Sequence, residues 1–238
     1  MMCLIAAATL VCAQEPPKTP DHVAHVRPFK EIRKEIEKAR AELTAFTAVL
    51  AVMRSDNAAD RTDTATGKLA FRLDDKKAAM LAWTLPAARG LHDGKTLTVT
   101  DAEERTFKTG EPWSDPRFFA AELILNGGCD LENHFTVRVT CDPGLAKKER
   151  GNKGKIEDDL ENPVGPYHLE LTPLDSALAR RIAKFAIDLD PVTMLPTSVV
   201  VSTESSSLTV VMRDVVKVEP KELADDLFKL DLAGLKKE

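Results

Sequence analysis

The residues able to do acid-base or metal chemistry are scattered along this sequence and form no recognisable catalytic motif. The chain contains no nucleophile elbow, no glycine-rich phosphate loop, no dinucleotide fingerprint and no His-Glu-x-x-His motif. His22 and His25 have a spacing that metal ligands can show, but they lie in a proline-rich segment. Two ligands on a flexible segment make a poor metal site. We therefore expect no metal and no cofactor.

The other titratable residues are more typical of turns and surfaces than of an active site. Neighbouring residues on a strand point to opposite faces, so adjacent aspartates such as 74–75 and 225–226 cannot share a proton there. His92 lies beside an Asp-Gly pair and is interpreted as a turn residue, and His168 flanks a predicted strand. The sequence thus predicts a protein that is not an enzyme. A His and an acid within hydrogen-bond reach inside a cleft would favour an enzyme instead.

Composition is compatible with a β-rich protein that has a substantial core. The 238 residues fit one large domain or two small ones, and 43% of them are apolar. The net charge of −5 gives no attraction to phosphate backbones, so we expect no nucleic-acid partner. No stretch of apolar residues is long enough to span a membrane.

Both the beginning of the chain and one internal segment differ in composition from the rest. Residues 1–13 are apolar and end in Val11-Cys12-Ala13, which is typical of a secretory signal and its cleavage site. We expect no lipid on Cys12, because Val11 is not the small residue that lipid attachment requires. Residues 14–27 contain three prolines and predict a linker. Residues 28–238 then form a single domain, with 142–166 as a charged loop insertion.

Two stretches of alternating apolar and polar residues predict antiparallel β-sheet. In the first, between residues 67 and 107, Leu97 and Val99 point to one face and the threonines around them to the other. Asp93-Gly94 favours a hairpin turn there, because Gly tolerates positive φ. The second stretch lies between residues 185 and 213. The sequence therefore predicts antiparallel sheet with one apolar face.

Amphipathic segments predict two helices that must bury an apolar side. Pro28 opens the first, whose apolar residues recur at steps of three and four: Phe29, Ile32, Ile36, Ala39 and Leu43. The second spans residues 117–126 and ends at Gly127-Gly128. Residues 44–54 predict a strand, and the polar residues 55–66 predict a loop or wide turn.

Two cysteines, Cys129 and Cys141, remain if the signal-like segment is removed. An oxidising compartment would favour a disulfide between them. A hairpin turning near residues 132–133 would instead bring Cys141 opposite Leu125 or its neighbour. A disulfide and a pair of buried thiols both stay open.

Several short motifs follow one another in a fixed order. They are Gly67-x-Leu-x-Phe, Trp83-Thr-Leu-Pro, Asp93-Gly-Lys-Thr-Leu, Leu169-x-Leu-x-Pro and Ile187-Asp-x-Asp-x-x-Thr-x-Leu-Pro. Together with the signal-like start and the first helix, this series resembles the outer-membrane lipoprotein carrier family, the LolA-like proteins, over residues 29–234. The Asp-Gly-Lys-Thr-Leu and Thr-x-Leu-Pro motifs are the most specific.

The resemblance implies an α+β, mainly β fold: an unclosed antiparallel β-barrel (a half-barrel) with helices lidding its concave apolar face. It also implies a monomeric periplasmic carrier of the acyl chains of lipoproteins or lipids, with transport partners at the inner and outer membranes. We expect the apolar cavity to be lined by Phe46, Leu69, Phe71, Trp83, Leu97, Val99 and Phe107. The expected lid residues are Ile32 and Ile36 on the first helix and Phe118, Phe119 and Leu123 on the second.

One departure from the family concerns its lid arginine, which lies between the Gly of the second strand and the Trp of the third. Here Arg72 is the nearest match counted from Gly67, and Lys77 the nearest counted back from Trp83, so neither is a clean equivalent. An alternative function on the same fold is an envelope sensor or structural module that binds a lipid or peptide without transporting it.

Overall fold

The computed structural model describes residues 25–56, 58–74, 78–110, 131–141 and 166–237. The predicted signal-like segment, the predicted second helix and almost all of the predicted insertion 142–166 lie outside these ranges. The predicted linker 14–27 is described only from His25, where the structure differs from the prediction. His25–Arg27 form a short strand, β1, that pairs with residues 139–141.

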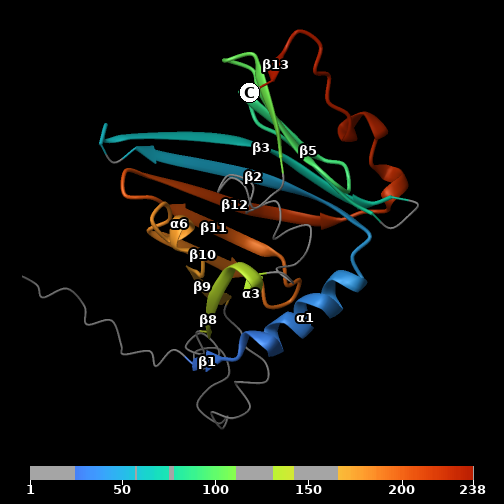
Figure 1. Ribbon diagram of the computed structural model, residues 1–238. Helices are drawn as coiled ribbons and strands as arrows, with labels where there is room; N and C mark the ends of the chain where they lie inside the picture. The colour runs from blue at the N-terminus through green and yellow to red at the C-terminus, as the bar shows by residue number, and fades with distance from the viewer. Residues whose placement is uncertain (1–24, 57, 75–77, 111–130, 142–165, 238) are drawn as a thin grey trace, which may run out of the picture.

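The strands of the described residues all belong to one open sheet. Its order is β1-β8-β9-β10-β11-β12-β2-β3-β4-β5-β6-β7-β13, and every pair is antiparallel except β13 with β7. The end strands β1 and β13 lie at the bottom and the top of Figure 1, so the sheet does not close on itself, as predicted for a half-barrel. The other strands are β2 (Ala45–Asp56), β3 (Arg61–Leu73), β4 (Ala79–Thr84), β5 (Ala88–His92), β6 (Leu97–Asp101), β7 (Thr106–Gly110), β8 (Phe135–Cys141), β9 (Tyr167–Pro173), β10 (Lys184–Leu189), β11 (Pro196–Ser202) and β12 (Ser206–Lys217), with β13 at Lys236–Lys237.

The helix α1 (Phe29–Ala41) follows β1 directly. Pro28 is its N-cap residue with an extended backbone, and Glu42 ends it. Phe29, Ile32 and Ile36 are buried on one side. The helix therefore begins where the proline predicts, but it stops before Leu43, which the three- and four-residue spacing had included. Two shorter helices, α3 (Leu131–His134) and α6 (Ser176–Ala179), flank strands β8 and β9.

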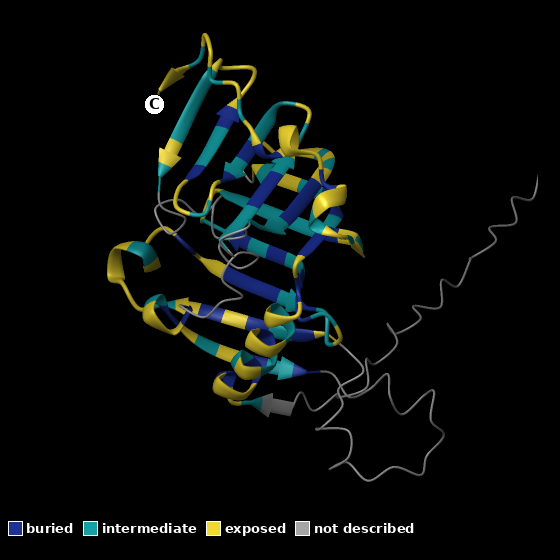
Figure 2. Ribbon diagram, turned by 90° about the vertical axis from the view of Figure 1, so that its right-hand side faces the viewer, coloured by how far each residue is buried: buried dark blue, intermediate teal, exposed yellow. Residues whose placement is uncertain are grey.

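The register of the strands divides the sheet into two faces. Phe46, Phe71, Leu81, His92 and Leu97 are successive cross-strand partners from β2 to β6, so their side chains share one face. We call this the inner face, because α1 packs on its continuation over β8. Figure 2 shows buried and intermediate positions along the strands, while many turns are exposed.

Two clusters of buried side chains cover the inner face. Cluster 1 joins the buried side of α1 to strands β8–β11 and includes Phe135, Val139, Tyr167, Leu169, Phe185 and Ile187. Cluster 2 covers strands β12, β2, β3, β4 and β6 and includes Leu43, Phe46, Ala48, Leu50, Leu69, Phe71, Leu81, Leu97, Leu195 and Met212. Val210 on β12 packs against both, so the apolar inner face is continuous.

The predicted loop over residues 55–66 is wrong, because most of it is strand. Strands β2 and β3 continue as a long hairpin to Asp56 and from Arg61. The hydroxyl groups of Ser55 and Thr62 lie 3.1 Å apart across it, and Asp56 accepts two backbone N–H bonds in the turn. β-branched threonines favour extended backbone even where both faces meet solvent. A polar strand of this kind has no apolar alternation to reveal it.

The C-terminal segment packs on the opposite, outer face. Its two 3-10 turns, η2 (Pro220–Glu222) and η3 (Asp225–Phe228), bring Leu223 and Phe228 against Ala45, Ala70 and Ala82. These small side chains leave room for the segment to lie close to the sheet. The C-terminal segment thereby covers part of the outer face of β2, β3 and β4.

Candidate functional site

Six of the seven predicted lining residues share the inner face. Phe46, Leu69, Phe71 and Leu97 are at most 3% exposed and belong to cluster 2. Trp83 and Val99, which are half-buried, pack against the same cluster. Trp83 pairs with Leu69 across β3, and its neighbour Gly90 on β5 pairs with Val99. The structure therefore brings these six side chains together.

Phe107 is the exception, and the prediction that it shares this face is wrong. It pairs with Thr100 on β6, whereas Leu97 pairs with Gly110 and Val99 with Lys108. Phe107 consequently points to the outer face with Thr100. In a strand the face is decided by register, and the turn length between β6 and β7 sets that register.

Trp83 is held flat against the neighbouring strand. A Cβ added at Gly90 would lie only 2.0 Å from Cζ2 of the indole ring, so the ring occupies the space that a side chain would fill. Close approach of this kind requires glycine. A half-exposed aromatic ring in a defined position thus lies at the margin of cluster 2.

The predicted lid residues of α1 lie on the inner face, but over a different part of it. Ile32 and Ile36 are 0% and 2% exposed and belong to cluster 1, not to the cluster that contains the predicted lining. The other predicted lid residues, Phe118, Phe119 and Leu123, lie outside the described residues. The stripe of α1 therefore indicated its buried side correctly, while its spacing could not say which strands it covers.

Arg72 does not hold a lid on the inner face. It pairs with Ala45 and Met80, so it points to the outer face. There its guanidinium donates to Asp225 at 2.7 Å and lies 4.3 Å from the centre of the Phe228 ring. The hydrogen bond from Arg72 lowers the pKa of Asp225. Lys77, the other possible match, lies outside the described residues.

An arginine does approach the inner face, but it comes from α1. The guanidinium carbon of Arg40 lies 4.8 Å from the centre of the Phe71 ring. This is a cation–π distance. The C-terminal turn of α1 therefore reaches cluster 2, although the rest of the helix covers cluster 1.

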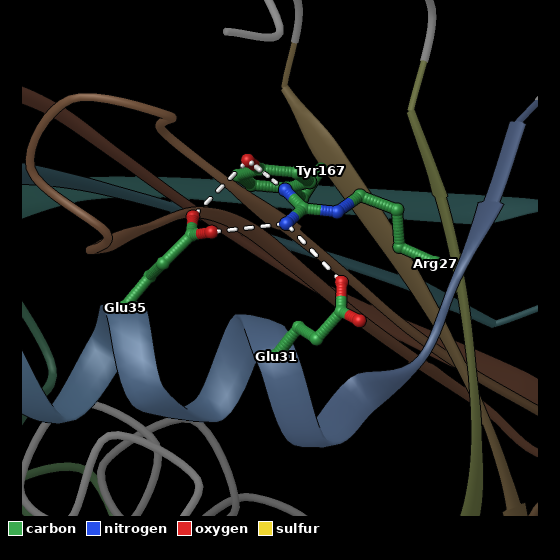
Figure 3. Close-up of polar contacts among 4 residues, drawn as sticks. All are labelled: Arg27, Glu31, Glu35 and Tyr167. Carbon is green, nitrogen blue, oxygen red and sulfur yellow. Dashed lines mark hydrogen bonds and ion pairs between the residues drawn. The ribbon is translucent and has the colours of Figure 1, made fainter. Parts of the chain in front are cut away.

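A polar network fastens the beginning of α1 to the sheet (Figure 3). Arg27 donates to the Tyr167 hydroxyl at 2.8 Å and to Glu35 at 3.1 Å, and it lies 3.4 Å from Glu31. The Tyr167 hydroxyl donates to the second oxygen of Glu35 at 3.2 Å. Burial, then the charge of Glu35, raise the pKa of Tyr167 to about 12. Burial disfavours the charge of Arg27, but Tyr167 and Glu35 outweigh it and raise its pKa.

The described part of the inner face is packed. Its cluster 2 residues contact one another, and no apolar hollow is described among them. A pocket of about 340 Å³ among the described residues lies where α1 joins β2 and is lined by Glu42, Leu43, Thr44, Ala45, Lys217, Val218, Glu219 and Glu222. Because four of these eight side chains are charged, this pocket does not suit a hydrocarbon chain.

One His and one acid do lie within hydrogen-bond reach, but on the outer face. Nδ1 of His168 is 2.7 Å from Oδ1 of Asp188, and both side chains are more than one third exposed. Glu170, 3.9 Å from the other ring nitrogen, is bound by Arg138. The described residues contain no group of three or more such side chains that could hold a metal ion. The His168–Asp188 pair therefore does not meet the condition for an enzyme stated above, a pair inside the barrel.

Two features of the site were missed by the sequence analysis. Leu81, which is 0% exposed, lies at the centre of cluster 2. Its alternation with Trp83 along β4 was the signal that could have found it. His92 was interpreted as a turn residue, yet it lies on the inner face between Leu81 and Leu97.

Comparison with known proteins identifies similar folds at low sequence identity. No family model and no curated protein matches the chain. Among solved structures it is similar to MucB, with a TM-score of 0.47 and 13% identity over 87% of this chain and 64% of that one. It is also similar to a LolA superfamily protein from Nitrosomonas europaea, with a TM-score of 0.39 and 11% identity over 84% and 97% of the two chains. A putative outer membrane lipoprotein-sorting protein domain from Vibrio parahaemolyticus has a TM-score of 0.40 and 12% identity over 83% and 97%.

These structures include members of the family that the sequence resembles. The chain spans 64% of the length of MucB. None of the helices in the described part of the chain is both long and apolar enough to cross a membrane.

Proposed function

We propose that this protein binds the acyl chain of a lipid or lipoprotein on the inner face of β3–β6 and carries it through the periplasm. The observation that supports this most is the continuous apolar inner face of an open sheet, with six predicted lining residues on it. Trp83 and Val99 form its half-buried margin. An open sheet can admit a ligand sideways, which a closed barrel cannot.

Because Phe46, Phe71 and Leu97 are buried, an acyl chain must displace what covers them, and α1 is the described helix that reaches this face. Lifting the whole of α1 would uncover cluster 1 and expose Phe29, Ile32 and Ile36, at about 2 kcal/mol each, or about 6 kcal/mol together. An acyl chain of about sixteen carbons gains roughly 13 kcal/mol when it leaves water. The chain can therefore offset the opening of α1. The net free energy of binding is smaller than the full transfer free energy of the acyl chain, because part of that energy opens the protein. An acceptor can therefore remove the chain.

The contacts at the two ends of α1 suggest how it opens. Its beginning is fastened by Arg27, Glu35 and Tyr167, whereas its last turn touches cluster 2 through Arg40. The chain continues into β2 through Leu43 and Thr44. Movement of the last turn away from Phe71 would begin to uncover cluster 2, whereas rotation of the whole helix would also break the Arg27 network and the pairing of β1 with β8.

Trp83 provides a direct test of this placement. The chain has two tryptophans, so Trp113→Phe leaves Trp83 as the only one. We expect the methyl ester of dibromostearate to quench Trp83 fluorescence, because bromine must lie close to the ring it quenches. The matched control is Phe107→Trp in a chain without Trp83 and Trp113, since this reporter lies on the outer face.

The outcomes test separately where the acyl chain binds and whether the protein transports it. Quenching of Trp83 with little effect on residue 107 supports the proposal. Equal quenching at both positions would show binding elsewhere, and no saturable quenching at either would refute acyl-chain binding. Transfer of the bound chain to acceptor vesicles distinguishes a carrier from the alternative, a module that binds lipid without transporting it.

A further inference from the structure

His92 is the buried polar side chain of the inner face. Buried polar residues among those described are His92 and Thr100, and Thr100 points to the outer face, where its hydroxyl bonds to Arg89. His92, 9% exposed, pairs with Leu81 on one side and Leu97 on the other, and both of these are fully buried. A polar group in such surroundings requires a hydrogen-bond partner.

The backbone satisfies only one nitrogen of the His92 ring. Nδ1 lies 3.2 Å from the carbonyl oxygen of Ala79 and 3.2 Å from the backbone N of Gly94. Nε2 makes no hydrogen bond to any residue that the structure describes. When Nδ1 accepts from Gly94, the neutral ring carries its proton on Nε2, which is then a donor without a described acceptor. When Nδ1 instead donates to the Ala79 carbonyl, Nε2 of the neutral ring is an acceptor.

A second feature makes this end of the inner face suitable for an anion. The Arg40 guanidinium lies over Phe71, and Phe71, Leu81 and His92 are successive partners on β3, β4 and β5. Two strand spacings, roughly 10 Å, thus separate the backbone of Phe71, whose ring Arg40 contacts, from the backbone of His92. The neighbouring carboxylate of Asp93 is turned into its own hairpin, where it accepts from the backbone of Lys95 and Thr96.

We infer that the acyl ligand carries a carboxylate, which Nε2 of His92 binds while the hydrocarbon chain lies over Trp83 and Val99. This inference rests on the proposed function and narrows its ligand to a fatty-acid anion. Trp83 lies diagonally across β4–β5 from His92, two residues along the strand from Leu81. A chain anchored at His92 can therefore run along the half-buried margin of cluster 2. A lipoprotein or a neutral ester has no carboxylate to place there.

The test compares dibromostearate with its methyl ester, using Trp83 fluorescence in the Trp113→Phe protein. We expect the acid to bind about tenfold more tightly than the ester, as a charged hydrogen bond in a buried site would give. His92→Asn keeps a short polar group for Gly94 and Ala79 but none at Nε2, so it should abolish the preference. His92→Gln, whose amide reaches the position of Nε2, should retain most of it. His168→Asn on the outer face is the matched control and should leave the preference unchanged.

Each outcome decides one of the two claims. Equal affinity of acid and ester, or a preference that survives in His92→Asn, would overturn the carboxylate anchor and leave acyl binding intact. Binding of neither probe would overturn both. If circular dichroism shows that His92→Asn does not fold, the affinity for the acid relative to the ester, measured in the protein with His92 and in His92→Gln, still decides the question.

Discussion

The contact between Gly90 and Trp83 makes a prediction whose size follows from the structure. A Cβ at Gly90 would lie 2.0, 2.1 and 2.3 Å from three atoms of the indole ring, far inside van der Waals contact. Gly90 is not one of the glycines with positive φ, so alanine suits its backbone. The Gly90→Ala substitution must therefore act by pushing the ring away. We expect it to lower the free energy of unfolding by about 1–3 kcal/mol.

A double-mutant cycle isolates this clash. Trp83→Leu removes the ring, so Gly90→Ala in that background should be neutral or should stabilise the protein by about 0.5–1 kcal/mol, as expected for Gly→Ala within a strand. The coupling energy between the two positions should then be about 1–3 kcal/mol. Urea unfolding followed by circular dichroism measures all four proteins without relying on tryptophan.

Fluorescence gives an independent check on the same reasoning. In the Trp113→Phe protein, Gly90→Ala should shift Trp83 emission to longer wavelength and weaken binding of the brominated ester, because the displaced ring meets water. The reasoning fails if Gly90→Ala costs the same stability with and without the Trp83 ring. An unchanged emission maximum would also refute it.

Three further predictions concern α1, its polar network and the C-terminal segment. Tyr167 is the only tyrosine, so absorbance titration should give a midpoint near pH 12 in the folded protein and about 10 in urea. Since folding raises this pKa, the stabilisation is complete below pH 10 and is lost as pH rises toward 12; Tyr167→Phe should remove that decline, and a folded midpoint near 10 would contradict it. Ile36→Ala should cost about 2–5 kcal/mol in urea unfolding, whereas Ile36→Val should cost about 0.5–1.5; similar small losses for both would mean that α1 is not packed as described. Phe228→Ala should make the C-terminal segment a substrate for limited proteolysis while the rest of the sheet resists, and uniform resistance would show that Phe228 does not hold the segment.

Much of the fold was predictable because one-sided burial imposes a period of two. Strands β4, β6, β10 and β11 were found in this way, and so was the buried side of α1. The missing parts have no such period. The far halves of β2 and β3 are polar on both faces, and β12 was predicted only as far as Arg213, where a bulge before Val216 breaks the alternation. Asp214, with a positive φ, lies in that bulge.

For the site, the sequence predicts which residues of a single strand share a face, but not which face of the sheet that is. Leu97 and Val99 identify a face within β6, but the face of Phe107 depends on a turn whose register the sequence does not show. Ile36 must be buried, yet only the tertiary structure shows that it belongs to the cluster formed with β8–β11. His92 has both a turn contact and an inner-face position, and the Asp-Gly pair beside it revealed only the first.

The pairing of β12 with β2 at the middle of the sheet has a consequence for how the molecule is made. It joins Ser206 to Asp56 and Lys217 to Phe46, which are 150 and 171 residues apart along the chain. Closing so long a loop is entropically costly and slows folding. The first strands emerging from the ribosome thus wait for nearly the last ones before the sheet can be completed. Strands β2 to β7 pair with their neighbours in sequence, so this half of the sheet can form first, and the two halves join only when β12 is available.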